Sequence, residues 1–151
     1  MPNTPAAIGE GMILYAANER VAAADVEEFC DKMVGAGRFD ALEERLIDAA
    51  SSVSGCGPAF VYQFIEALAD GGVACGLPRP KAMEYAAQTL VGAAGMVLAT
   101  GRNPGQLKDE VCSPGGSTIA GVYALEKGGM RAAVMSAVLE SFEKNKELGK
   151  Q

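Results

Sequence analysis

The hydrophobic pattern divides the chain into a short α/β part and a long helical part. Ile8–Ala17 contains the apolar run Met12-Ile13-Leu14-Tyr15 between glycines and an asparagine, which predicts a strand. Ala22–Val34 carries apolar residues at helical spacing, and Arg38–Glu44 is a candidate second strand. A strand, helix and strand of this size cannot bury two sheet faces. We therefore expect this part to be the end of a larger α/β domain or to pack on a partner.

From about Ile47 onward the pattern predicts helices throughout. Gly57-Pro58 begins one helix, and Gly76-Leu77-Pro78 ends it. The remaining predicted helices are Lys81–Thr100, closed by Gly101, then Asn103–Val111, Ile119–Glu126 and Met130–Glu147. Alanines and glycines in the longest of these would let another helix approach closely, including one from a second subunit. The expected fold class is mainly α, with residues 1–48 as an α/β piece and residues 49–151 as an all-helical domain.

Composition narrows the partners that the chain can have. Its 151 residues suit one domain, or one domain and a fragment of another. With 13 basic and 19 acidic residues the net charge is −6, which argues against nucleic acid or an anionic membrane as partner. The most apolar stretch, Leu90–Ala99, is shorter than the ~20 residues of a membrane span. We expect it to be a packed helix, and no secretory leader is evident.

The cysteine and histidine counts limit the chemistry. The four cysteines, Cys30, Cys56, Cys75 and Cys112, form no C-x-x-C pair, and there is no histidine to complete a zinc site. We interpret them as reduced thiols of a cytoplasmic protein and expect no metal. Without histidine, a Ser-His-Asp or Cys-His system cannot be built from this chain alone. A general acid would have to be a hydroxyl, a carboxyl, a lysine or solvent.

Two further kinds of site find little support. Three G-x-G segments lack the third glycine of the dinucleotide fingerprint: Gly9-Glu10-Gly11, Gly35-Ala36-Gly37 and Gly55-Cys56-Gly57. No Walker sequence is present. The carboxylate pairs Glu66/Asp70 and Glu143/Glu147 lie four residues apart, which is typical of solvated helix faces.

The strongest local signal is the turn Ser113-Pro114-Gly115-Gly116-Ser117-Thr118, directly ahead of the helical pattern at Ile119. The first N–H groups of a helix have no intrahelical partner and lie at the positive end of its dipole, which favours a carboxylate or phosphate there. Taken alone, the same residues could be a turn and an N-cap. Asp109 lies just before the turn, where a capping or salt-bridge role competes with a catalytic one.

Several longer segments carry a family resemblance. They are Met1–Pro5, Ser54–Phe60, Glu66–Val73, Gly76–Arg79, and Pro104-Gly105-Gln106-Leu107-Lys108-Asp109 continuing through Ser113–Ile119. In order and spacing they resemble pyrroline-5-carboxylate reductase over essentially the whole chain. The resemblance implies reduction of the ring C=N of L-1-pyrroline-5-carboxylate to L-proline with NADPH or NADH. It also implies a Rossmann-like dinucleotide-binding domain, most of which is missing here, followed by a helical dimerisation domain. Homodimers are implied, and in some members decamers.

The resemblance further implies site residues. Ser113 and the backbone amides of Gly116, Ser117 and Thr118 would bind the substrate carboxylate, and the Thr118 hydroxyl would serve the ring nitrogen as the catalytic group. Asn3, Thr4 and Pro5 would line the nicotinamide, with Asp109 and Val111 approaching it from the helical domain. Cys56 stands where the family commonly has serine, a change that we expect to affect helix capping rather than chemistry.

Two alternatives stay open. The isolated chain could be a dimerisation fragment without turnover, or the parent enzyme could reduce another cyclic imine acid, because a carboxylate site says little about ring size.

Overall fold

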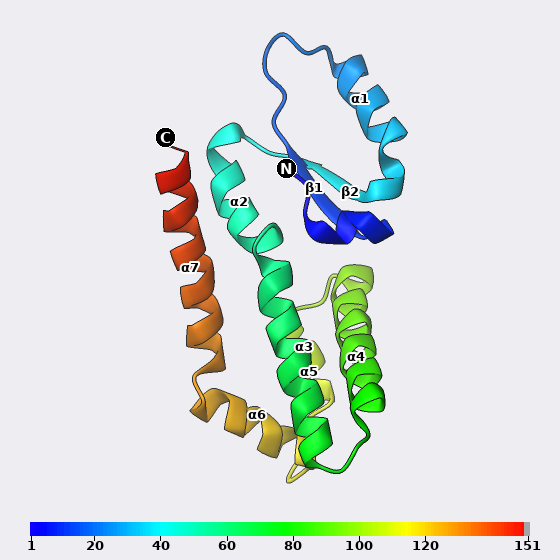
Figure 1. The fold of residues 1–151 in the computed structure, drawn as a ribbon, viewed down its shortest axis with the longest axis vertical. Helices are drawn as coiled ribbons and strands as arrows, with labels where there is room; N and C mark the ends of the chain where they lie inside the picture. Colours follow the sequence, from blue (N-terminus) through cyan, green and yellow to red (C-terminus); the bar gives the residue numbers. More distant parts are fainter. Residues whose placement is uncertain (150–151) are drawn as a thin grey trace. The chain divides into compact units, whose positions relative to one another are not determined.

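The computed structural model describes residues 1–149, which fold into two compact units. One unit contains residues 1–60 together with the C-terminal segment from Val134, and the other contains residues 61–133. Helices dominate both units, and the described residues contain a single two-stranded sheet. Figure 1 shows the elements in chain order. The prediction of a mainly α fold with an N-terminal strand, helix and strand is confirmed. The division at residue 48 into two domains stays a prediction.

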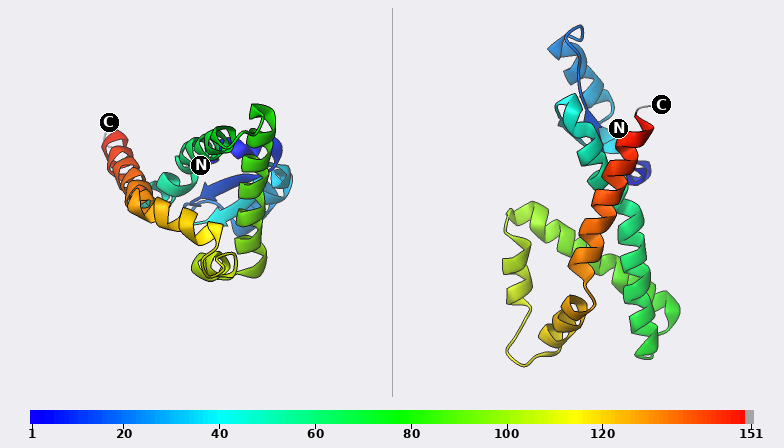
Figure 2. Two further views of the ribbon diagram at one scale, coloured as in Figure 1. Left: turned by 90° about the horizontal axis from the view of Figure 1, so that it is seen from below. Right: turned by 90° about the vertical axis from the view of Figure 1, so that its left-hand side faces the viewer.

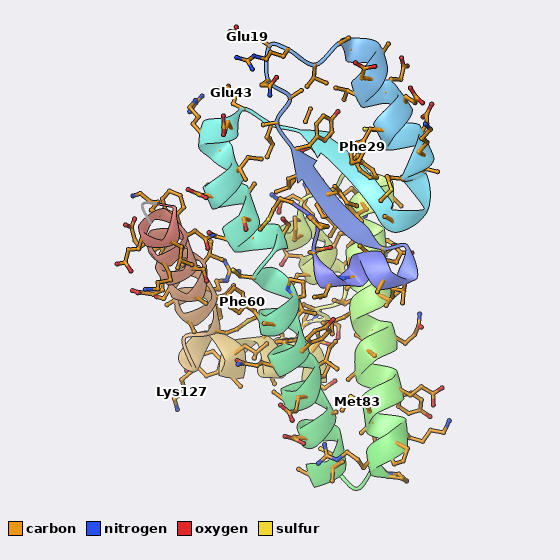
Figure 3. The ribbon with its side chains drawn as sticks, turned by 45° about the horizontal axis from the view of Figure 1, so that its top comes forward. Glu19, Phe29, Glu43, Phe60, Met83 and Lys127 are labelled. Carbon is orange, nitrogen blue, oxygen red and sulfur yellow. The ribbon has the colours of Figure 1, made fainter. Side chains whose placement is uncertain are left out.

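The sheet pairs β1 (Gly11–Tyr15) with β2 (Gly37–Ala41) in parallel, with Gly11 opposite Gly37. Figure 2 shows the two strands running in the same direction. The connection contains α1 (Ala23–Lys32), whose Phe29 meets Phe39 of β2 edge to face with ring centroids 5.8 Å apart. Phe29 lies on the side of α1 that faces the strands (Figure 3). Spacing alone therefore located this helix correctly.

Short 3-10 helices flank the strands. They are η1 (Thr4–Ile8), η2 (Val34–Ala36) and η3 (Glu44–Leu46). Strand β2 ends at Ala41, three residues before the predicted end at Glu44, where η3 begins. The amide of Leu42 makes one more bond, to the Tyr15 carbonyl at 2.9 Å, and the chain then turns into η3.

The core of the first unit is formed by β1 and α2 (Ile47–Ser54). Ile13 and Leu14 of β1 are buried, and so are two serines of α2, Ser51 and Ser52. The Ser52 hydroxyl donates to the Asp48 carbonyl at 2.8 Å and accepts from the Asn145 side-chain amide at 3.2 Å. Burying a hydroxyl costs little when it is hydrogen-bonded in this way.

The second unit contains a hairpin of two long helices. Helix α3 (Gly57–Ala74) and helix α4 (Arg79–Thr100) bury Ala69, Ala82 and Ala86 between them, with Ile65 and Val73 packed alongside. These small side chains allow the close helix approach that the sequence predicts. The chain continues through α5 (Pro104–Glu110), α6 (Ser117–Lys127) and α7 (Met130–Leu148). Most expected helices are confirmed, although α4 and α6 each begin two residues earlier than predicted.

One expectation is wrong for the single chain. Leu90–Ala99 was expected to be a packed helix, yet most of this part of α4 is exposed, including 65% of Val91 and 74% of Leu98. The alanine hairpin buries only the N-terminal half of α4, and most residues of the C-terminal half are exposed in the described chain. None of the helices in residues 1–149 has the length and apolarity needed to cross a membrane.

Candidate anion-binding site

The Ser113–Thr118 turn follows a short helix whose two ends are both fixed. At the start of α5, the Asn103 side-chain oxygen accepts from the Gly105 amide at 2.8 Å, as expected of an N-cap residue. At the end, Glu110 pairs through both carboxylate oxygens with the guanidinium of Arg102, one contact being 3.1 Å from Nη1 to Oε2. A helix of 7 residues is too short to be stable alone, so these contacts help to hold it.

The charges of this pair support each other. The hydrogen bond from Arg102, followed by its positive charge, lowers the pKa of the Glu110 carboxyl, and the same bond raises the pKa of Arg102. Next to them, Lys108 Nζ lies 2.7 Å from Asp109 Oδ1, and this hydrogen bond raises the pKa of Lys108. Asp109 is thus a salt-bridge partner in this structure, one of the two roles that the sequence left open.

The turn itself depends on two glycines for different reasons. Gly115 has φ +68°, a left-handed conformation that side chains disfavour. Gly116 has an ordinary extended backbone, but a Cβ there would collide with the Ser113 hydroxyl. The Gly116 amide donates to the Ser113 carbonyl at 3.0 Å. This amide was expected to bind the substrate carboxylate, but it is engaged within the turn instead.

The first turn of α6 presents the remaining donors. Gly116 is the N-cap residue, and no side chain caps the helix. The first helical bond is donated by Ala120 to the Gly116 carbonyl, at 3.4 Å, and among residues 1–149 neither the Ser117 amide nor the Thr118 amide donates a hydrogen bond. Ser113, Ser117 and Thr118 are all exposed. The turn therefore leaves two adjacent amides and nearby hydroxyls open to an anion.

A cavity of about 460 Å³ lies beside the turn, within the second unit. Its walls come from α4, α5 and α6 and are mostly apolar, with Thr118, Lys108 and Glu110 as their polar members; the others are Ala93, Met96, Val97, Pro104, Leu107, Val111 and Val122. Thr118 thus belongs both to the anion-binding end of α6 and to the cavity wall. Such a mixture of apolar wall and few polar groups suits a small ring bearing one charged substituent.

The structure separates the predicted site residues into two groups. Asp109, Val111, Ser113, Gly116, Ser117 and Thr118 belong to the second unit, within 10 residues of one another along the chain. Asn3, Thr4 and Pro5 belong to the first unit, where Thr4 is exposed and Asn3 and Pro5 are partly buried. The residues assigned to the substrate therefore all belong to the second unit, whereas those assigned to the cofactor are divided between the two units.

Sequence reasoning missed the polar residues that support the turn. Arg102 precedes α5 and Glu110 is its last residue, eight residues along the chain, a spacing that no helical rule selects. Lys108 belongs to a family motif in the sequence, but its place in the cavity wall is evident only in the structure. In the described part of the chain no cluster of acidic and cysteine side chains could hold a metal ion.

Comparison with known proteins identifies relatives along the whole chain. A family model for pyrroline-5-carboxylate reductase dimerisation matches residues 44–148. The pyrroline-5-carboxylate reductase of Pisum sativum is 46% identical over 148 residues, covering 98% of this chain and 54% of the relative. That of Escherichia coli is 45% identical over 150 residues, covering 99% and 56%. The chain therefore spans about half the length of the curated relatives that it matches.

Solved structures agree with the fold. A Plasmodium falciparum pyrroline carboxylate reductase with NADP bound superimposes with a TM-score of 0.92 at 42% identity, covering 99% of this chain and 61% of that one. A Streptococcus pyogenes 1-pyrroline-5-carboxylate reductase gives a TM-score of 0.91 at 35% identity, covering 97% and 57%.

Proposed function

Since the chain belongs to the pyrroline-5-carboxylate reductase family, we propose that it is the C-terminal part of an NAD(P)H-dependent reductase converting L-1-pyrroline-5-carboxylate to L-proline. In this proposal residues 1–48 complete a dinucleotide-binding domain, and residues 49–151 form the dimerisation and substrate-binding domain. The observation that carries the proposal is the pair of open amides at the start of α6, next to an apolar cavity. Proline synthesis would be the pathway, and the cytoplasm its location, in keeping with four free thiols.

The substrate carboxylate would bind at the N-terminus of α6. The amides of Ser117 and Thr118 and the hydroxyl of Ser113 are the proposed donors, with the helix dipole adding to the attraction. Gly116 contributes by having no side chain, which lets Ser113 lie against the backbone. Fixing the carboxylate there orients the ring, and orientation is a large part of what an enzyme offers a hydride transfer.

Thr118 is the proposed catalytic residue. Hydride addition to the C=N carbon puts electron density on the ring nitrogen, so a hydrogen bond to that nitrogen must strengthen as the reaction proceeds. Thr118 is the second residue of α6 and lines the cavity, and in this proposal its hydroxyl serves a ring whose carboxylate is held by the backbone amides. The chain has no histidine that could take this role.

The nicotinamide would supply the hydride and would be held by Asn3, Thr4 and Pro5, with Asp109 and Val111 from the helical part. The residues of this set fit an uncharged ring: Pro5 and Val111 are apolar, Thr4 is a neutral hydroxyl, and Val111 is 63% exposed. None of them is cationic, and the chain has no glycine fingerprint, so the phosphates would bind elsewhere. The NADP in the Plasmodium relative supports this cofactor class.

The proposed assembly is a homodimer built on the helical domain, and dimers of this kind would be the building blocks of a decamer. In residues 1–149 many large apolar side chains are exposed, among them Val91, Leu98, Tyr123 and Leu139, each by more than 60%. A stable protein rarely leaves so much apolar surface in water, and a second copy of the chain would cover it. The matched family model, described as a dimerisation region, supports that partner.

One experiment separates the proposed reductase from its alternatives. The 151-residue chain and the complete reductase polypeptide are each mixed with NADPH and pyrroline-5-carboxylate, and loss of NADPH absorbance is followed. We expect turnover by the complete protein only, with the chain alone behaving as a dimerisation fragment. A complete protein that ignores this substrate but reduces a cyclic imine acid of another ring size would favour the alternative substrate. No turnover with any of them would refute the reductase proposal.

A further inference from the structure

Asn3 makes an unusual pair of side-chain hydrogen bonds in the first unit. Its amide nitrogen Nδ2 donates to the carbonyl of Ser54 at 2.9 Å, across 51 residues of sequence. Its oxygen Oδ1 accepts from the backbone amide of Met12 at 2.9 Å. Both bonds are partly buried, and both polar atoms of the side chain are therefore engaged with protein.

The Met12 bond closes one edge of β1. In a parallel pair, alternate residues of a strand point their amides toward the neighbouring strand, and the others point away. Met12 and Leu14 are two residues apart; the Leu14 amide donates to the Met1 carbonyl at 3.0 Å, and the Met12 amide donates to Asn3. The backbone of residue 1 and the side chain of residue 3 thus replace a neighbouring strand at this edge.

The Ser54 bond closes the end of a helix. Ser54 is the last residue of α2, and the final carbonyls of a helix lack intrahelical donors. Asn3 supplies one, immediately before the Gly55–Cys56 link that leads into α3. An asparagine at a helix start ordinarily caps that helix. Asn3 is the N-cap residue of η1, yet no side-chain cap bond is made there.

We propose that Asn3 is a positioning residue that ties the Thr4–Pro5 turn to the edge of β1 and to the end of α2, and that it acts on the cofactor through these two neighbours. This role rests on the proposed function, in which Thr4 and Pro5 face the nicotinamide. The two bonds fix the orientation of the Asn3 side chain and leave it one N–H donor and one oxygen lone pair, so its main contribution in this proposal is to hold its two neighbours.

The two hydrogen bonds of Asn3, which we call the Asn3 tie, can be tested by amide hydrogen exchange on the 151-residue chain without measuring turnover. Asn3→Asp keeps an acceptor for Met12 but sets a carboxylate against the Ser54 carbonyl, whereas Asn3→Ala removes both bonds. We expect Asn3→Asp to speed exchange of the Gly55 and Cys56 amides about fivefold and to spare Met12. Asn3→Ala should speed exchange at both places. The matched control is Asn18→Asp, because Asn18 accepts from the Arg20 amide in an exposed turn.

Acid pH provides a rescue that loss of packing would not show. Below about pH 4 the introduced aspartic acid is protonated, and its hydroxyl can donate to Ser54 while its other oxygen accepts from Met12. Exchange at Gly55 and Cys56 in Asn3→Asp should then return toward that of the control at the same pH. The Asn3 tie would be refuted if Asn3→Asp left exchange at Gly55 and Cys56 unchanged near neutral pH. It would also be refuted if the exchange rates at these amides did not recover in acid.

Kinetics on the complete reductase test the positioning role. Asn3→Asp should raise KM for NADPH about fivefold or more, with a smaller change in KM for the imine acid, because the turn on the nicotinamide side loses its anchor. An unchanged KM for NADPH would overturn the positioning role even if the exchange results hold. A wild-type protein without turnover would refute the proposed function, while the exchange pattern would still decide the Asn3 tie.

Discussion

At the scale of single residues, the candidate site is built from backbone geometry with few side chains. The Gly116 amide is consumed by the turn, so the carboxylate depends on the two amides that follow and on the Ser113 hydroxyl. Thr118 combines an open amide with a side chain that belongs to a cavity-lining residue. Its side chain is therefore the most informative one to change.

Replacing the Thr118 hydroxyl should slow catalysis more than it weakens binding. Thr118→Val keeps the shape and removes the donor, so we expect kcat/KM of the complete reductase to fall by about 1 to 3 kcal/mol of transition-state stabilisation. Thr118→Ser, which keeps the hydroxyl, is the matched control and should stay close to wild type. Steady-state kinetics measure both variants, and wild-type kinetics in the valine variant would reject the catalytic role.

A methyl group at Gly116 should disturb the carboxylate site through Ser113. The Gly116→Ala side chain would meet the Ser113 hydroxyl and push it from the turn, so we expect KM for the imine acid to rise about tenfold with a smaller effect on kcat. Gly121→Ala is the control, because a Cβ at that position would meet no described atom within 4 Å apart from its chain neighbours and the backbone of its own helix. Equal effects of the two substitutions would show that the Ser113 contact is unimportant.

At the scale of elements, α5 is the support on which the turn rests. The helix is short and carries a cap at its start and the Arg102–Glu110 pair at its end. Both partners of the pair are partly exposed, 39% for Arg102 and 57% for Glu110, so the attraction is screened by water and salt. Its value to the protein is geometric, because it fixes where α5 ends and where the turn begins.

The stability that this pair contributes should depend on pH in a defined direction. The pKa of Glu110 is lowered in the folded protein, so its contribution is present above the pKa of the unfolded chain and is lost as the pH falls through the lowered folded value. Arg102, with its raised pKa, stays charged throughout. Urea unfolding should show wild type more stable than Glu110→Gln near neutral pH, with the difference vanishing well below about pH 4.

The control for that measurement is Glu140→Gln, since no ion pair of Glu140 is found in the part of the chain that the structure describes. Near neutral pH its urea midpoint should lie close to that of wild type. A Glu110→Gln difference that grows as the solution is acidified would contradict the assignment.

At the scale of the whole molecule, the distribution of apolar residues is unlike that of an independent monomer. The described residues bury few large side chains and expose many, and the uncharged C-terminal half of α4 is largely in solvent. Hydrophobic burial is the main force that stabilises a fold, and in our proposal a second copy of the chain supplies the burial that this surface lacks.

A charge introduced on this surface should break the assembly. Leu98→Arg replaces a side chain that is 74% exposed in the single chain and, in our proposal, covered in the dimer. We expect the mass from light scattering to fall toward that of one chain, with a lower melting temperature. Gln88→Arg, at an exposed polar position of the same helix, should leave the mass unchanged. A Leu98→Arg protein that keeps its assembly would place the interface elsewhere.

The local sequence pattern was sufficient to predict most helices and strands and to locate the segment that contains the candidate site. The positions of glycine and proline predicted where α3, α4 and α5 lie, because the conformations that start or stop a helix depend on one or two residues. The turn before α6 was recognisable for the same reason. The roles of these residues came from the resemblance of the sequence motifs to the reductase family. The comparisons bear out the family, whereas the residue roles stay predictions.

Contacts between distant residues decided the rest. No sequence rule joins Asn3 to Ser54 or Arg102 to Glu110, and none shows that the Gly116 amide is used up by Ser113 while the next two remain open. The exposure of Leu90–Ala99 likewise depends on which face the hairpin covers. Helical periodicity and turn chemistry act over a few neighbouring residues, and a sequence states them directly. Hydrogen-bond partners and burial depend on how separate segments meet in space, which only the tertiary structure determines.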